Sequence, residues 1–136
     1  MTIYVLDSSA VLRYIDREVG SDRVIEIFKA CVLGNGQARI SAVQWGEIAG
    51  NVRRKFGAQH QSRILDSLIP LDLEIVPATS ERAVHAAELR IDRKISYADA
   101  FAAELAIGIA DHVLVTADYG FKALDDFARI EFLPAK

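Results

Sequence analysis

The sequence predicts an α/β fold with a largely parallel central sheet. Short apolar runs typical of buried strands alternate with amphipathic stretches typical of helices, and strands separated by helices usually pair in parallel. The composition, with 51% hydrophobic and 26% charged residues in a chain of 136, is that of one globular domain. We therefore expect a single domain over residues 1–136 and exclude an intrinsically disordered chain.

The first half of the chain predicts two strands and several helices. Residues 3–6 form a continuous apolar run, as in a strand that is buried on both faces. Gly34 ends the second helix as a C-cap, and Pro70 stops the last helix of this half. We expect strands at 3–6 and 38–41, and helices at 10–15, 21–33, 43–57 and 58–69.

The second half predicts three further strands. Charged and polar residues interrupt its longest apolar stretch, 98–115, which excludes an ordinary membrane span, so we expect no membrane partner. We expect strands at 73–76, 112–115 and 129–132, helices at 79–92 and 96–110, and another helix after Asp118.

Charge and cysteine content limit the partners and the compartment. The net charge is −3 and the pI is about 5.6, so a nucleic acid would have to be held by local basic groups or metal ions. Cys31 is the single cysteine, which excludes an intramolecular disulfide and indicates a reducing compartment. It lies in an apolar run, so we expect its side chain to be buried. Residues 1–6 lack the features of a signal peptide. We therefore expect a cytoplasmic protein.

Acidic residues fall where predicted strands end. Asp7 follows the first strand, Asp118 follows the fourth, and Asp99 lies in the first turn of a helix. Sites in parallel sheets form at the carboxyl ends of strands where the strand order reverses, and we expect the first and fourth strands to be neighbours there. Glu47 is predicted close to the apolar face of a helix, where a carboxylate is costly unless it is paired or metal-bound. Together these acids predict a cleft suited to Mg²⁺, which prefers oxygen ligands.

Each acid also fits a purely structural role. Asp7 and Asp118 fit helix N-caps, Ser96 and Asp99 match a capping box, and Glu47 fits a solvated helix position. Taken singly, these residues leave both interpretations open.

Four short motifs that contain these acids follow one another along nearly the whole chain. They are YVLDSSAV at 4–11, SAVQWGE at 41–47, SYADAFAA at 96–103 and LVTADYGF at 114–121. In this order they resemble the acidic motifs of the PIN-domain ribonucleases, specifically the VapC-type toxins of bacterial and archaeal toxin–antitoxin pairs. The resemblance implies a PIN-like three-layer sandwich: a mostly parallel sheet of about five strands with helices on both faces.

The resemblance also implies an activity. It implies endonucleolytic cleavage of RNA with Mg²⁺ or Mn²⁺ as cofactor, and a cognate antitoxin protein as partner. Gly120 departs from the family pattern, because many members carry a further acid at that place, so we expect a weaker outer metal position. The implied catalytic residues and metal ligands are Asp7, Glu47, Asp99 and Asp118, with Ser9 and Thr116 as supporting hydroxyls.

Further expectations concern surfaces. Broad apolar helix faces predict a homodimer, although the same side chains also fit a core; they include Phe28, Trp45, Phe56, Ile64 and Leu68. Basic side chains are candidates to guide the RNA backbone, although each also fits a solvated helix face; they are Arg13, Arg53, Arg54, Lys55, Arg90, Arg93 and Lys94.

Other function classes fit less well. A phosphotransferase of the haloacid-dehalogenase type needs an aspartate at position 9, where Ser9 stands. A receiver-like signalling module needs an acidic pair after the first strand and an aspartate after the third, where Ser8 and Pro77 stand. The main alternative is a PIN-fold domain that has lost catalysis and serves only as a binding module.

Overall fold

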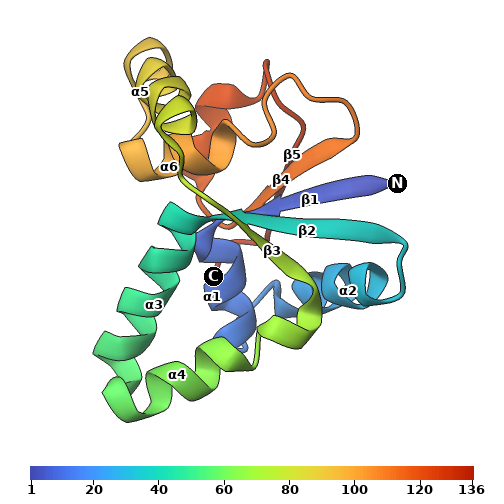
Figure 1. The fold of residues 1–136 in the computed structure, drawn as a ribbon. Coiled ribbons are helices and arrows are strands. Elements are labelled where there is room, and N and C mark those ends of the chain that lie inside the picture. Colours follow the sequence, from blue (N-terminus) through green and yellow to red (C-terminus); the bar gives the residue numbers. More distant parts are fainter.

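The computed structural model describes residues 1–136. It has a central sheet of five parallel strands with helices on both faces (Figure 1). The spatial order is β3-β2-β1-β4-β5, and every neighbouring pair is parallel. The predicted α/β fold with a parallel sheet is therefore confirmed. The strands are β1 (Thr2–Leu6), β2 (Gly36–Ser41), β3 (Leu73–Val76), β4 (His112–Thr116) and β5 (Ile130–Phe132).

The helices divide between the two faces of the sheet. In Figure 1, α1 to α4 lie below the sheet and α5 and α6 lie above it. The chain thus forms the three layers implied by the sequence. The helices are α1 (Ser8–Ile15), α2 (Ser21–Val32), α3 (Ala42–Phe56), α4 (Ala58–Asp66), α5 (Ser80–Arg93) and α6 (Tyr97–Ala103), and two short 3₁₀-helices are η1 (Ile69–Leu71) and η2 (Tyr119–Leu124).

Three predicted helices are shorter or tighter than the sequence indicated. α6 ends at Ala103, not near residue 110, and turns follow it, with Gly108 in the left-handed region at φ 69°. Leu105, which lies within these turns, is buried in the core, so the long apolar run comes from buried turns and not from a longer helix. Likewise, α4 ends at Asp66 ahead of η1, which contains Pro70, and the segment after Asp118 forms the 3₁₀-helix η2.

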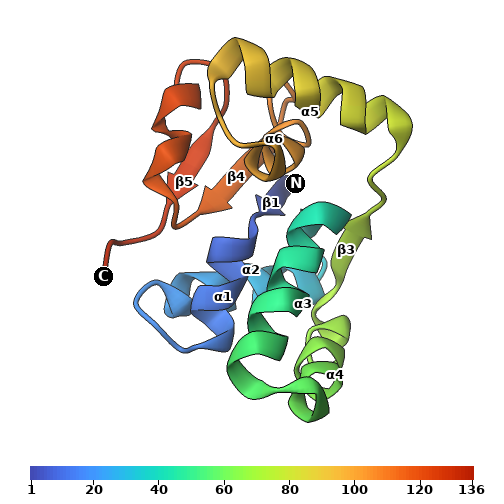
Figure 2. The ribbon, with the colours of Figure 1, turned by 90° about the vertical axis from the view of Figure 1, so that its left-hand side faces the viewer.

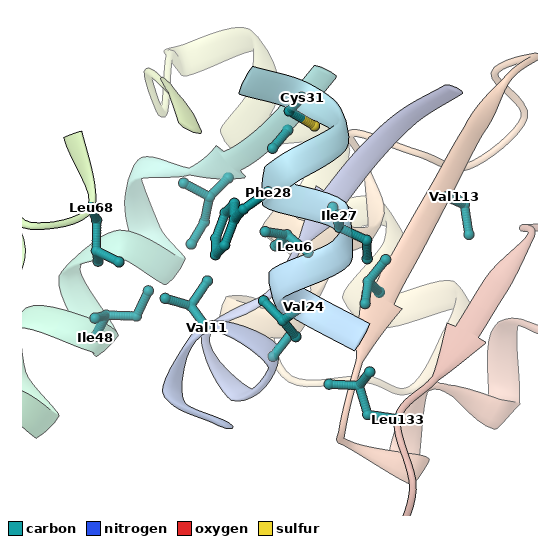
Figure 3. Close-up of a cluster of buried hydrophobic side chains, with 14 of the residues drawn as sticks. Leu6, Val11, Val24, Ile27, Phe28, Cys31, Ile48, Leu68, Val113 and Leu133 are labelled. Atoms are coloured by element: carbon teal, nitrogen blue, oxygen red, sulfur yellow. The ribbon is translucent and has the colours of Figure 1, made fainter. Parts of the chain in front are cut away.

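Alternate residues of the central strands enter two hydrophobic cores. Leu6 packs with side chains of α1, α2 and α3, as Figure 3 shows. Val5 and Leu114 pack on the opposite face with α6 and η2. Cys31 is buried in the first core, as predicted. Residues 3–6 of β1 are all apolar because helices cover both faces of the sheet, so that side chains pointing either way can be buried. No helix is both long and apolar enough to cross a membrane.

The strand order reverses between β1 and β4. The chain passes from β1 through β2 to β3 on one side and then returns to β4 on the other side of β1. The carboxyl ends of β1 and β4 therefore lie side by side, as predicted, with Leu6 paired to Val115. Figure 2 looks onto this edge of the sheet, with α1 and α3 below it and α6 above it. Parallel sheets form ligand sites at such a position.

Candidate active site

Asp7 lies at the centre of this edge, directly after β1. It is the N-cap of α1, and its Oδ1 accepts a hydrogen bond from the backbone N–H of Ala10 at 2.9 Å. The hydroxyl of Ser9 donates to the same oxygen at 2.7 Å, and the hydroxyl of Thr116 donates to Oδ2 at 2.6 Å. The side chain is only 2% exposed. The capping role is therefore real, and it fixes a buried carboxylate at the end of the strand.

Burial controls the ionisation of Asp7. Removal from water raises the pKa of its carboxyl from 3.8 to about 6, although the hydroxyls of Thr116 and Ser9 act in the opposite direction. The negative charge of Asp99 adds a smaller upward shift in the pKa. Mutual repulsion of the acids is therefore present, but desolvation is the larger cause of the raised pKa.

Two hydroxyls connect Asp7 to the segment that carries Asp118. The Ser9 hydroxyl accepts from the backbone N–H of Ala117 at 2.9 Å. The Thr116 hydroxyl accepts from the backbone N–H of Asp118, also at 2.9 Å. The end of β4 is thus bonded to the start of α1, which places Asp118 beside the edge that Asp7 occupies.

Asp99 links the buried acid to the outer ones. It is half-buried in the first turn of α6, where the Ser96 hydroxyl accepts a hydrogen bond from its backbone N–H at 3.1 Å. Burial raises the pKa of the Asp99 carboxyl, and the charges of Asp118 and Glu47 raise it further. Since the charge of Asp99 also acts on Asp7, the four acids share one electrostatic environment at the edge of the sheet.

The predicted position of Glu47 close to the apolar face of a helix agrees with the structure, which places this residue just outside the buried face of α3. Its side chain is exposed, and the Ser8 hydroxyl donates to its Oε1 at 3.2 Å. The buried face of α3 consists of Gln44, Ile48 and Val52, which lie one helical turn apart. Glu47 lies next to that face, but at the sheet-edge end of α3, where solvent reaches it.

The donor chemistry of this cluster fits a hard divalent cation. All four acids offer carboxylate oxygens, the ligands that Mg²⁺ prefers, and none of them forms an ion pair with a basic side chain. A cation would therefore relieve a charge that the chain leaves uncompensated. As the side chains are arranged, no group of three acidic, histidine or cysteine residues is close enough to form a ready-made cage.

The structure bears on two further residues, Arg13 and Gly120. Arg13 is only 8% exposed and donates to the carbonyl oxygens of Val19 and Pro134 at 2.7 and 2.8 Å, so its proposed contact with RNA is wrong. The backbone N–H of Gly120 donates to Asp118 Oδ1 at 2.8 Å, and a Cβ at position 120 would lie 3.0 Å from that oxygen. Glycine therefore avoids a close contact with Asp118, and the weaker outer metal position expected from Gly120 stays a prediction.

Sequence reasoning missed one buried polar residue, Gln44. Its Oε1 accepts from the backbone N–H of Ser8 at 2.8 Å, and its Nε2 donates to the carbonyl oxygen of Ala98 at 2.6 Å. A glutamine spaced four and eight residues before Ile48 and Val52, which are apolar, was the available signal.

Comparisons with known proteins agree with one another. The family model described as PIN domain matches residues 4–127. Among solved structures, VapBC2 from Rickettsia felis bound to a DNA fragment from their promoter matches with a TM-score of 0.77 at 21% identity, over 98% of this chain and 100% of that chain. DNA-bound VapBC from Salmonella typhimurium matches with a TM-score of 0.72 at 18% identity, over 97% and 98% of the two chains. FitAcB from Neisseria gonorrhoeae matches with a TM-score of 0.64 at 20% identity, over 95% of this chain and 96% of that chain. These structures share the fold; no curated protein sequence matches the chain.

Proposed function

The chain belongs to the PIN domain family, and from that premise we propose that it is a metal-dependent endoribonuclease acting as the toxin of a VapBC-type toxin–antitoxin pair in the cytoplasm. The observation that carries the proposal is the acidic edge of the sheet. Asp7 is buried without a cationic partner, and its charge and those of Asp99, Asp118 and Glu47 act on one another. Such a cluster is suited to a divalent cation and, through it, to a phosphodiester.

We propose that Asp7 and Asp99, the two least exposed of these four acids, hold Mg²⁺ or Mn²⁺, with Glu47 and Asp118 as the outer ligands. A bound ion of this kind lowers the pKa of a water molecule and offsets charge on a phosphate. Ser9 and Thr116 hold the Asp7 carboxylate in one orientation through bonds of 2.7 and 2.6 Å. The exposed carboxylates of Glu47 and Asp118 face solvent, where they can orient the attacking water and the substrate.

We propose an antitoxin protein as the physiological partner. The solved structures that share the fold include complexes of VapBC type. The chain also has an apolar groove of about 460 Å³ beside α2, suited to a partner segment. The groove is lined by Tyr14, Arg17, Ile25, Phe28, Lys29, Val32, Leu33 and Leu71.

The structure buries two of the five apolar side chains from which the sequence predicted a homodimer, whereas Phe56 stays 39% exposed. Leu68 is buried in the core and is not available to a partner, and Phe28 reaches the surface only as part of the lining of the groove beside α2. Exposed apolar side chains also occur on α5, where Val84 is 57% exposed and Ile91 is 73% exposed. They lie two helical turns apart on one face. Light scattering at micromolar concentrations tests the dimer, and a monomer throughout would contradict it.

The activity is tested with purified protein and total cellular RNA. Cleavage is expected with Mg²⁺ or Mn²⁺ and is expected to stop with a chelator. Attack by water predicts 5′-phosphate and 3′-hydroxyl ends, which can be mapped by sequencing adaptor-ligated fragments. Cleavage that persists in chelator would contradict the metal-dependent mechanism. RNA binding without cleavage would favour the alternative, a catalytically inactive PIN-fold binding module.

A further inference from the structure

Gln44 is an unusual residue to find on the core face of a helix. It lies in the first turn of α3 and is only 1% exposed. Burial of a primary amide is costly unless its donor and acceptor are both bonded. An apolar side chain would fill the same space without that cost, so the two hydrogen bonds of Gln44 need an explanation.

The two hydrogen bonds of Gln44 join segments on opposite sides of the sheet edge. Its Oε1 binds the N–H of Ser8, the residue directly after Asp7, at 2.8 Å. Its Nε2 binds the carbonyl oxygen of Ala98, the residue directly before Asp99, at 2.6 Å. Ser8 begins α1 below the sheet, and Ala98 lies in α6 above it. One neutral side chain therefore bridges the backbones next to two acids.

The acids on these two segments repel each other. The charge of Asp99 raises the pKa of Asp7, so the two carboxylates act on one another without a compensating cation in the chain. Repulsion favours separation of α1 and α6, whereas the Gln44 bridge opposes it. Only a side chain with both a donor and an acceptor can make these two bonds. Glutamine supplies both without adding a further charge.

We propose that Gln44 is a positioning residue that sets the separation of Asp7 and Asp99, and thereby the affinity of this edge for a divalent cation. The inference rests on the proposed function in one respect, that these acids bind such a cation. It assigns Gln44 no contact with the cation or the RNA.

The test compares Gln44→Met with a matched control, Gln61→Met. Methionine keeps the length of the side chain and removes both hydrogen bonds. Gln61 also donates to a backbone carbonyl of α3, that of Ala49 at 2.9 Å, but it lies in α4, away from the acids. Mn²⁺ is added to each metal-free protein without RNA, and the free ion is measured by electron paramagnetic resonance. Thermal unfolding is recorded in parallel.

Gln44→Met is expected to bind Mn²⁺ about tenfold or more weakly than the wild type, as for other residues that orient metal ligands. Gln61→Met is expected to stay within about twofold, whatever its thermal stability. If Gln44→Met does not fold, Gln44→Asn replaces it, because asparagine keeps a neutral amide but is one methylene shorter and cannot make both bonds, to Ser8 and to Ala98. The same weakening is then expected.

A folded Gln44 variant that binds Mn²⁺ as tightly as the wild type would overturn the inference, even if its thermal stability fell. A wild-type chain that bound no Mn²⁺ would also overturn it. Failure of the proposed function has a different signature, because a wild-type chain that binds Mn²⁺ but leaves RNA intact contradicts the ribonuclease while the Gln44 comparison is still decided.

Discussion

The inner and outer acids at the edge of the sheet are held in different ways. Asp7 is buried, and both of its carboxylate oxygens accept hydrogen bonds from the chain. Glu47 and Asp118 are exposed, and each carboxylate accepts one hydrogen bond, from the Ser8 hydroxyl and the Gly120 N–H respectively. A fixed inner acid can define the position of a cation, whereas exposed acids can adjust to a substrate. Substitutions inside should therefore affect stability and activity together, and substitutions outside should affect activity alone.

Asp7→Asn is expected to have the largest effect. Loss of the buried charge should reduce RNA cleavage by about 10³-fold or more, because the inner acid holds the cation. The fold should persist, since asparagine can still accept from Ala10 and Ser9. Cleavage rates and circular dichroism check both statements, and near wild-type cleavage or an unfolded variant would contradict them.

The pH dependence of stability sharpens the same point. Burial raises the pKa of Asp7 from 3.8 to about 6, so the folded chain binds this proton more tightly than the unfolded chain. The stability that this group contributes is present below pH 3.8 and is lost as the pH rises through 6. Asp7→Asn should therefore gain stability over the wild type across this interval, by up to about 3 kcal/mol at neutral pH. Urea unfolding without divalent ions measures the difference; a gap independent of pH would contradict the prediction.

Thr116→Val tests the support of the inner acid. Valine removes the hydroxyl that donates to Asp7 and accepts from the Asp118 N–H, while the shape of the side chain is nearly unchanged. We expect cleavage to fall by about 10–100-fold and the free energy of unfolding to fall by about 1–2 kcal/mol. Thr79→Val is the control, because Thr79 caps α5 and should cost stability without affecting cleavage. Equal cleavage by both variants would show that Thr116 has no role beyond structure.

Glu47→Gln is expected to have the smallest effect on the molecule as a whole. Its side chain is exposed, so the free energy of unfolding should change by less than about 0.5 kcal/mol. Cleavage should fall by about tenfold, since an outer ligand is weakened. The exposed Glu88 on α5 provides the control, Glu88→Gln, which should leave cleavage unchanged. A wild-type rate for Glu47→Gln would remove this residue from the proposed site.

The sequence was most informative where local rules apply. Asp7 and Asp118 follow apolar runs, and the carboxyl ends of parallel strands meet at one edge, so their proximity could be predicted. The Ser9 and Thr116 hydroxyls lie on the Asp7 carboxylate, as the motif suggested. These placements depend on residues within or beside a strand, and the sheet then brings them together.

Tertiary packing decided the rest. The exposure of Glu47 and the burial of Gln44 depend on how α3 is rotated against α1 and α6. The two residues are only three positions apart on α3, but one faces solvent and the other faces the core. The early end of α6 was hidden because the apolar run continues through buried turns to Leu105 and beyond. Apolar periodicity does not distinguish a buried helix from a buried irregular segment.

The central claim, that these acids form one cation site used to cleave RNA, is tested most directly by Asp99→Asn. The charge of Asp99 raises the pKa of Asp7, and the charges of Asp118 and Glu47 raise the pKa of Asp99, so Asp99 connects the inner acid with the outer ones. Mn²⁺ affinity and cleavage of total RNA are measured on the same preparations of the variant and the wild type. The account predicts that the variant stays folded and that both quantities fall together. A folded Asp99→Asn variant that binds Mn²⁺ and cuts RNA as the wild type does would contradict it.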